Sequence, residues 1–343
     1  MNILPPNVFL NSLVMGVSFF ILAKSADFLV DGATAIAERL GVPKMIIGIV
    51  LVAFATTSPE FTVSVLAAIQ GHPEIALGNA IGSVIADDAF ALALGILVAP
   101  TVIIVDSRIL KSAGIFLISI DVIAFLFSLN GTIGRVEGAF LIILLIGYLT
   151  AVVINEQKHR NRRKKEEIGQ ELKEHIKPGK TALQVLRFLA GVAGLLIGSE
   201  LLINSSTNLA REFGVPESVI GLTMIALGTS LPEIATCYVA SRKGHGDLAL
   251  GDIIGADILN ILWIVGAASL ANPITVEKSV VFFAFPTMIV IVLTMLLFAR
   301  IGYKLHKWKG VVLLSMYLLF LASSIYLFYF KGIEMVPLQT TGV

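Results

Sequence analysis

Ten apolar segments are the feature of this sequence that most restricts its fold. A helix needs about 20 predominantly apolar residues to cross the hydrocarbon core of a bilayer. The chain is 56% hydrophobic and only 14% charged, whereas about a quarter of the residues of a soluble domain are charged. We therefore predict an all-α polytopic membrane protein with ten transmembrane helices. The segments are residues 8–36, 43–69, 75–99, 109–129, 135–154, 182–210, 215–241, 247–271, 277–299 and 309–330.

The basic residues between these segments predict the orientation in the membrane. The one long connection, residues 156–180, is rich in Lys and Arg, and cytoplasmic loops are enriched in both. With this loop inside, only Arg135, Arg211, Lys278 and Lys331 fall on the opposite side. Five segments precede the loop. We therefore expect a multi-pass protein of the cell membrane with both termini outside and the loop in the cytoplasm.

The chain contains an internal duplication. The 41 residues from Gly48 align without a gap with those from Gly221, with 14 identities that include Thr, Pro, Glu and a Gly-His pair. Each half holds five segments, an odd number, so the halves are expected to insert with opposite orientation, as inverted repeats do. The predicted organisation is a five-helix repeat over 1–155, the basic loop over 156–180, a second five-helix repeat over 181–332 and a C-terminal tail over 333–343.

A proline interrupts the second and the seventh segments, in the stretches "ATTSPE" and "LGTSLPE". Proline lacks an N–H and disfavours helical geometry at the preceding residue, so the helices should break near Pro59 and Pro232. Irregular backbone at membrane depth is tolerated where it is buried in protein or lines a cavity. Each break brings freed carbonyl groups together with hydroxyls and a carboxylate. These side chains are Thr56, Thr57, Glu60, Thr229, Ser230 and Glu233.

The next segment of each half adds further polar groups. GxxxG patterns at 78–82 and 251–255 let helix backbones approach each other closely. Nine residues after the first glycine of each pattern come Asp87 and Asn260, and Ser83 lies one turn before Asp87 on the same face. We expect these side chains to share a site with the two breaks.

This donor set contains only oxygen atoms, which indicates a cation site. Oxygen ligands suit Ca²⁺, which takes six to eight of them, and Na⁺, whereas the lack of Cys and His in the set argues against zinc or copper. A charge at the bilayer centre costs about 2.5–3.5 kcal/mol on insertion scales and indicates function by default. A kink with structural carboxylates is the alternative interpretation. The sequence does not determine the roles of Asp27, Asp88, Glu200, Asp252 and Asp257.

The duplicated stretches resemble the two α-repeats of the calcium/cation antiporter superfamily, whose best-known branch is the sodium/calcium exchangers. The motif resemblance covers about residues 48–95 and 221–266. It implies exchange of Ca²⁺ for Na⁺, or for H⁺, by alternating access, with segments 8–36 and 182–210 sliding against an ion-binding core. The resemblance assigns the ion ligands to Glu60, Asp87, Glu233, Asn260, Thr56, Thr57, Ser83, Thr229 and Ser230, with backbone carbonyls near Ala53 and Ala226.

Three departures from the pattern of that family bear on the counter-ion. The acid stands in the first repeat and the amide in the second, as Asp87 and Asn260, which is the reverse of the usual order. Ala256 stands where a serine is expected. The first repeat reads "ATTS" where Gly-Thr-Ser-Leu is usual, and Asp88 is an additional acid. The sequence therefore leaves open whether Na⁺ or H⁺ is the counter-ion or K⁺ takes part, and a Ca²⁺/H⁺ antiporter is the alternative to a Ca²⁺/Na⁺ antiporter.

Two other classes of membrane protein were weighed. An intramembrane aspartyl protease carries a Gly-x-Gly-Asp motif, but Ala249 replaces the first glycine in the stretch 249–252 and no Tyr-Asp partner is visible. A cation channel would pass a unidirectional current, whereas an antiporter only exchanges ions. We expect no enzyme activity and no cofactor, with Ca²⁺, Na⁺ or H⁺ and the lipid bilayer as partners and no nucleic acid. A monomer is consistent with the sequence, which does not determine the oligomeric state.

Overall fold

The structure is a computed structural model that describes residues 7–167, 181–213 and 226–327. Within this part of the chain, eight helices are long and apolar enough to cross a membrane, and a pair bent by 47°, Lys44–Thr56 with Ser58–Ile69, forms a ninth candidate. The prediction of an all-helical, multi-pass membrane protein is confirmed. The remaining predicted segment, 215–241, begins within residues 214–225, which the structure does not describe. The total of ten helices and the inverted repeat stay predictions.

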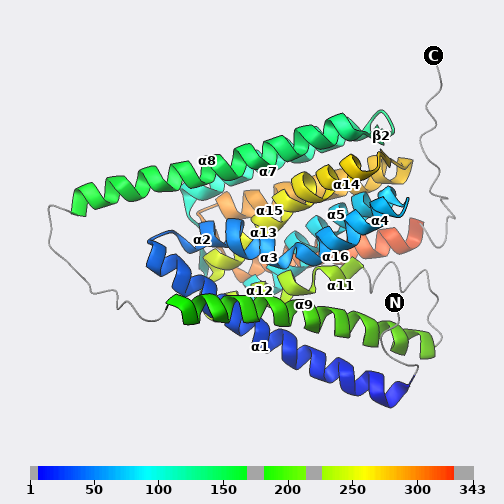
Figure 1. Cartoon of the computed structure of the whole chain (residues 1–343), viewed down its shortest axis with the longest axis horizontal. Coiled ribbons are helices and arrows are strands. Elements are labelled where there is room, and N and C mark those ends of the chain that lie inside the picture. Colours follow the sequence, from blue (N-terminus) through cyan, green and yellow to red (C-terminus); the bar gives the residue numbers. More distant parts are fainter. Residues whose placement is uncertain (1–6, 168–180, 214–225, 328–343) are drawn as a thin grey trace.

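The first half is built of helices (Figure 1), and two short π-helical turns lie between some of them. α1 begins where the side chain of Asn7 accepts a hydrogen bond from the backbone N–H of Leu10 at 2.9 Å, and it ends at Gly41 in the left-handed conformation, φ 62°. Both are common helix ends. The elements are α1 (Val8–Leu40), α2 (Lys44–Ile47), η1 (Gly48–Val52), α3 (Ala53–Thr56), α4 (Ser58–Ile69), α5 (Pro73–Ala86), η2 (Asp87–Ala91), α6 (Leu92–Val98), α7 (Ser107–Ser128) and α8 (Arg135–Glu167).

The second half, in its described residues, is likewise built of helices with two short π-helical turns among them. Its hairpin before α13 contains Gly244 at φ 82°, as Gly71 at φ 95° does before α5. Glycine adopts this left-handed conformation without a steric penalty, which explains the glycine of the duplicated Gly-His pair. The elements are α9 (Thr181–Glu212), α11 (Ala226–Thr229), α12 (Leu231–Arg242), α13 (Gly246–Leu259), η4 (Asn260–Val265), α14 (Gly266–Ala271), η5 (Val280–Ala284), α15 (Phe285–Arg300) and α16 (Lys307–Ile325).

Two short antiparallel strand pairs join the halves of the chain. β1 (Ile103–Ile104) pairs with β4 (Lys304–Leu305), and β2 (Thr132–Ile133) pairs with β3 (Ile274–Thr275). Each pair therefore takes one strand from each half. Strands of two residues are too short to show an alternating apolar pattern in the sequence, so they were not predicted.

The two spans that follow the bent helices form the centre of the molecule. In Pro73–Val98 and Gly246–Ala271, 72% and 83% of the most apolar window is buried, against 22% in the span that begins at Arg135. Close helix packing contributes to this burial, because a side chain at Gly251 would collide with the backbone carbonyl of Met45. The GxxxG pattern of the second half thus acts as predicted.

The helices α1 and α9 pack along each other at one side of the molecule (Figure 1). α1 also contacts α12, the helix that follows the break of the second half. On the opposite side α8 runs to Glu167, well beyond the predicted end of its segment at residue 154. The predicted loop over 156–180 therefore begins as a continuation of α8, consistent with the strong helix propensity of Lys, Arg and Glu.

Candidate functional site

Both predicted helix breaks are present. Thr57 separates α3 from α4 with φ −77° and ψ 0°, and Ser230 separates α11 from α12 with φ −81° and ψ 8°. The following proline occupies the first turn of α4 and of α12, where its missing N–H leaves no hydrogen bond unmade. The new helices therefore begin just beyond each break with the proline in their first turn, and the hydroxyl residues Thr57 and Ser230 occupy the breaks.

The carboxylates that follow the breaks are buried. Glu60 in α4 and Glu233 in α12 are each 1% exposed, as are Asp87 and Asn260. Asp87 and Asn260 are the first residues of the π-helical turns η2 and η4. Such turns are rare and occur frequently at functional sites. Sequence reasoning found these residues but not the turns, since π-helical geometry has no simple sequence pattern.

A contact between the halves joins one break to the opposite glutamate. The hydroxyl of Thr57 donates a hydrogen bond to Oε1 of Glu233 at 3.1 Å. In the reciprocal position the Ser230 hydroxyl lies near the carboxylates of Glu60 and Asp87, outside hydrogen-bond geometry. Glu60 also interacts electrostatically with Glu233 and Asp87. The structure therefore brings together the three carboxylates that the sequence analysis predicted.

A second pair of contacts involves two residues to which the sequence analysis gave no role at the site. Thr56 donates to Oδ1 of Asp252 at 3.1 Å, and Thr229 donates to Oδ1 of Asn79 at 3.2 Å. Asn79 in turn donates to the hydroxyl of Ser64 at 3.0 Å. Asp252 and Asn79 occupy equivalent positions of the duplicated stretches. That equivalence was the signal that could have assigned both residues to the site.

The remaining predicted ligands are placed as follows. Ser83 is 1% exposed and lies in α5 four residues before Asp87. The carbonyl of Ala53 accepts a hydrogen bond from the Thr57 N–H at 2.9 Å. A carbonyl oxygen has two lone pairs, and the second is free for an ion when the Thr56 hydroxyl, 3.3 Å away, donates to Asp252. Ala226 is the first residue of α11.

Many of the buried oxygen atoms at this site lack a hydrogen-bond partner. Buried polar atoms in proteins are nearly always paired, so each exception calls for an explanation. No three acidic, His or Cys side chains of the described residues converge tightly enough to hold one metal ion. An ion here would therefore also need hydroxyl and carbonyl ligands. Among the described residues, the unpartnered atoms at this site include both oxygens of Glu60 and of Asp87, Oε2 of Glu233, Oδ2 of Asp252, Oδ1 of Asn260 and the hydroxyls of Ser83 and Ser230.

Three further buried acids lie beside this site. Asp88 and Asp257 interact with each other outside hydrogen-bond geometry, and Asp121 of α7 interacts with Asp88. All three are 0% exposed. Asp88 thus points away from the ligands that surround Asp87, as its position about 100° further around the helix predicts.

Comparisons with known proteins identify relatives of this chain. The family model described as "Sodium/calcium exchanger protein" matches residues 10–154 and 183–326, once in each half. The sodium/calcium exchanger MaX1 of Methanosarcina acetivorans is 31% identical, over 92% of this chain and 99% of that protein. The putative antiporter CaxA of Alkalimonas amylolytica is 34% identical, over 88% and 94%.

A solved structure has the same fold. The sodium-calcium exchanger NCX_Mj superimposes with a TM-score of 0.79 at 27% identity, over 92% of this chain and 99% of that one. These relatives are named exchangers and antiporters, which are transporters and not enzymes. The protease interpretation of the stretch 249–252 therefore has no support among them.

Proposed function

The chain belongs to the sodium/calcium exchanger protein family, and on that premise we propose that it is a secondary active antiporter that exchanges Ca²⁺ for Na⁺ across the cell membrane. The named relatives support Ca²⁺ and Na⁺ as the transported ions. In this proposal the ions are substrates that pass through the protein, and no resident cofactor takes part. Both termini lie outside, and the loop over 156–180 lies in the cytoplasm.

The unpartnered buried oxygens at the two breaks are the observation that supports this proposal most strongly. Glu60 and Asp87 are 1% exposed, and none of their four carboxylate oxygens has a hydrogen-bond partner among the described residues. Buried carboxylates without partners are strongly unfavourable. A transported cation is the partner that would offset this cost, and it would leave when the site opens.

Exchange follows from competition for one set of ligands. Glu60, Glu233 and Asp87 repel one another when no cation is near. One Ca²⁺ or several Na⁺ can offset that repulsion, and both ions use carboxylate, hydroxyl and carbonyl oxygens. Because the same oxygens serve both, occupancy by one ion excludes the other. This exclusion couples the two opposed fluxes.

The packing of the helices supports an alternating-access cycle. α1 and α9 pack mainly on each other, at one side of the core that carries the site. In the proposed cycle this pair slides against the core, in the plane where α1 meets α12. The two breaks then open in turn to either side of the membrane, as in transporters built from repeats.

H⁺ in place of Na⁺ is the second candidate for the counter-ion. The observation that favours it is Ala256, which is buried in α13 and offers no hydroxyl where the family has a serine. A Na⁺ position that used this hydroxyl would lose one ligand. The ligand set around Glu60 and Glu233 is the same in both versions.

Gradient-driven flux in inside-out vesicles tests the proposal. We expect Ca²⁺ uptake when a Na⁺ gradient is imposed at clamped pH. Uptake driven only by a pH gradient would show that the counter-ion is H⁺ and not Na⁺. A unidirectional current without exchange would indicate a channel. Glu60→Gln and Glu233→Gln should each abolish Ca²⁺ exchange, whereas Glu74→Gln, in the exposed first turn of α5, should not. Activity that survives either of the first two substitutions contradicts the site assignment.

A further inference from the structure

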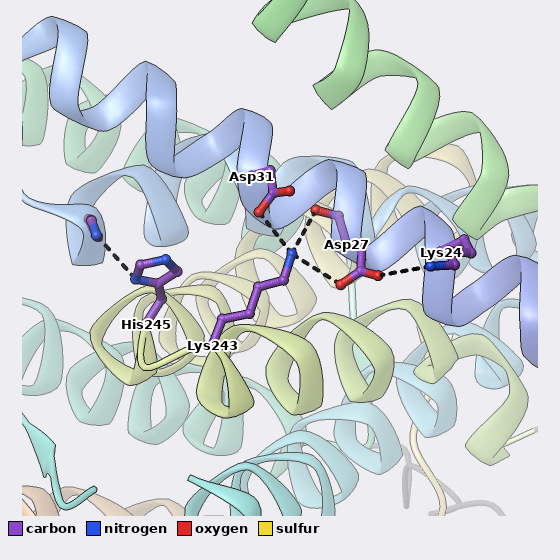
Figure 2. A network of polar contacts seen from close by, with 6 residues as sticks. Lys24, Asp27, Asp31, Lys243 and His245 are labelled. Atoms are coloured by element: carbon purple, nitrogen blue, oxygen red, sulfur yellow. Dashed lines mark hydrogen bonds and ion pairs between the residues drawn. The ribbon is translucent and has the colours of Figure 1, made fainter. Parts of the chain in front are cut away.

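Lys243 connects α1 to the end of α12. Its ammonium group lies 2.8 Å from Oδ1 of Asp31 and 3.0 Å from Oδ1 of Asp27, and 3.4 Å from the backbone carbonyl oxygen of Asp27 (Figure 2). Three oxygens of one helix thus surround a cation that is covalently attached to another element. From the sequence the role of Asp27 was open between lining an ion pathway and bonding another helix, and nothing in it pairs Asp27 with Lys243.

This contact lies at a cleft between the two helices. The cleft has a volume of about 660 Å³, and its walls include Ala23 and Asp27 of α1, Leu231 and Ala235 of α12, and Lys243. Leu231 lies two residues before the buried Glu233. The cleft therefore extends along α12 from the Lys243 contact toward the break that carries the ion ligands.

The charges at this contact favour its formation. Burial alone would lower the pKa of Lys243, but the hydrogen bonds and charges of Asp31 and Asp27 outweigh burial and raise this pKa above its ordinary value. Lys24 lies on the other side of Asp27 at 3.9 Å, within the same helix. The Lys24 ion pair thus stays within α1, whereas the ion pairs of Lys243 link α1 to the end of α12 (Figure 2).

The spacing of the two acids relates this contact to a movement of α1. Asp27 and Asp31 are four residues apart, which is about one helical turn of 5.4 Å. A translation of α1 by one turn in either direction leaves at most one of the two carboxylates beside Lys243. In one direction it also brings Lys24 toward Lys243, where like charges repel.

We propose that Lys243 is an ionic latch that holds α1 in the position described here and must lose one of its two carboxylates when α1 slides. This inference rests on the proposed function, since the sliding of α1 belongs to the alternating-access cycle. The latch would bias the antiporter toward the observed position of α1. Partly exposed ion pairs contribute about 0.2–1 kcal/mol, so loss of the latch should change the populations of the two positions by about 1.5- to 5-fold.

A cysteine reporter in the cleft tests the latch without measuring transport. Cys237 is the one cysteine of the sequence and is buried, so Cys237→Ala provides the background and Ala235→Cys the reporter. The rate at which the cysteine introduced at position 235 reacts with a membrane-impermeant thiol reagent is measured in right-side-out and in inside-out vesicles. Ala23→Cys, on the facing wall of the cleft, is a second reporter that replaces the first if Ala235→Cys does not fold.

We expect Lys243→Gln and Asp31→Asn to change the ratio of the two reaction rates in the same direction, by about 1.5- to 5-fold. The double variant should change the ratio no more than the larger of the two single changes. The reason is that both substitutions remove the same ion pair, between Lys243 and Asp31. Lys24→Gln removes a positive charge from the same network without breaking the link to α12, and should change the ratio less than Lys243→Gln does. An unchanged ratio in Lys243→Gln, or an equal change in Lys24→Gln, overturns the latch.

Flux measurements on the same vesicles separate this proposal from the proposed function. If the background protein exchanges Ca²⁺ but Lys243→Gln leaves the labelling ratio unchanged, the latch is wrong and the antiporter stands. If the ratio changes as expected but the background protein exchanges no Ca²⁺, the latch stands as a conformational contact and the proposed transport is wrong.

Discussion

The hydroxyl of Thr57 donates a hydrogen bond to the carboxylate of Glu233 at 3.1 Å, across 176 residues of sequence. Thr57 sits at the break of the first half, and Glu233 follows the break of the second. The first half thus orients a carboxylate of the second. The site exists only when both halves are docked.

Removal of the Thr57 hydroxyl should weaken Ca²⁺ binding. Thr57→Val leaves Oε1 of Glu233 without its hydrogen bond, and an unsatisfied buried acceptor costs about 1–3 kcal/mol. We therefore expect the half-saturating Ca²⁺ concentration to rise about 5- to 150-fold. Thr57→Ser keeps the hydroxyl and should stay close to the parent protein. Equal values for the Val and Ser variants would contradict a role of this hydroxyl.

Asp252 should influence Ca²⁺ more than Na⁺. Asp252→Asn retains an oxygen that can accept the hydrogen bond of Thr56, but it removes a charge that interacts with Glu233 and Asp87. Coulomb energy scales with the charge of the ion. The loss of binding free energy caused by Asp252→Asn should therefore be about twice as large for Ca²⁺ as for Na⁺.

The concentrations of each ion that half-saturate exchange measure this difference. Asp247→Asn, in the first turn of the same helix, removes an equal charge far from Thr56 and should change neither concentration. A loss of the same size for Ca²⁺ and Na⁺ would show that Asp252 acts through packing and not through its charge.

Lys309 should stabilise the fold rather than the site. It is 1% exposed, and its ammonium group donates to the carbonyls of Phe298, Ile301 and Lys304 at 2.6, 3.0 and 2.7 Å. These carbonyls lie at and just after the end of α15. Lys309→Met leaves them unsatisfied, at about 1–3 kcal/mol for a buried group, and should lower the Tm in detergent by several degrees. Lys307→Met, exposed two residues earlier, is the control and should leave the Tm unchanged.

His245 should make stability depend on pH in the mildly acidic range. Its Nδ1 lies 3.1 Å from the ammonium group of Lys44, and burial together with this charge lowers the pKa of His245, while Asp247 and Glu38 oppose the shift. Because the pKa of His245 is lower in the folded state than in the unfolded state, neutral His245 contributes to the stability of the fold. This contribution to stability is fully present above about pH 6.5 and is lost as the pH falls through the folded-state pKa.

Thermal melts between about pH 5 and pH 8 test this expectation. His245→Gln should flatten the dependence of Tm on pH by about 1–3 °C, a small amount because the ring is partly exposed. His72→Gln, the exposed equivalent in the first half, should keep the parent dependence. A parent-like pH profile in His245→Gln would contradict a role of the Lys44 contact.

Local sequence properties predicted much of the fold. The lengths of the apolar segments indicated nine spans that the described residues contain, and the prolines located both helix breaks to within a few residues. The duplication identified Glu60, Glu233, Asp87 and Asn260 as equivalent pairs. Hydropathy, proline geometry and an internal alignment are properties of short stretches, so they can be read without knowing what each stretch packs against.

The contacts between distant segments depended on the tertiary structure. The sequence placed Thr56 beside Thr57, but only the packing of the halves sends the first hydroxyl to Asp252 and the second to Glu233. The same holds for Lys243 and its two partners on α1. These partners are about 170 to 220 residues apart in the sequence, and their distances are set by how whole helices dock. Hydropathy fixes which segments are buried but not which buried side chains meet.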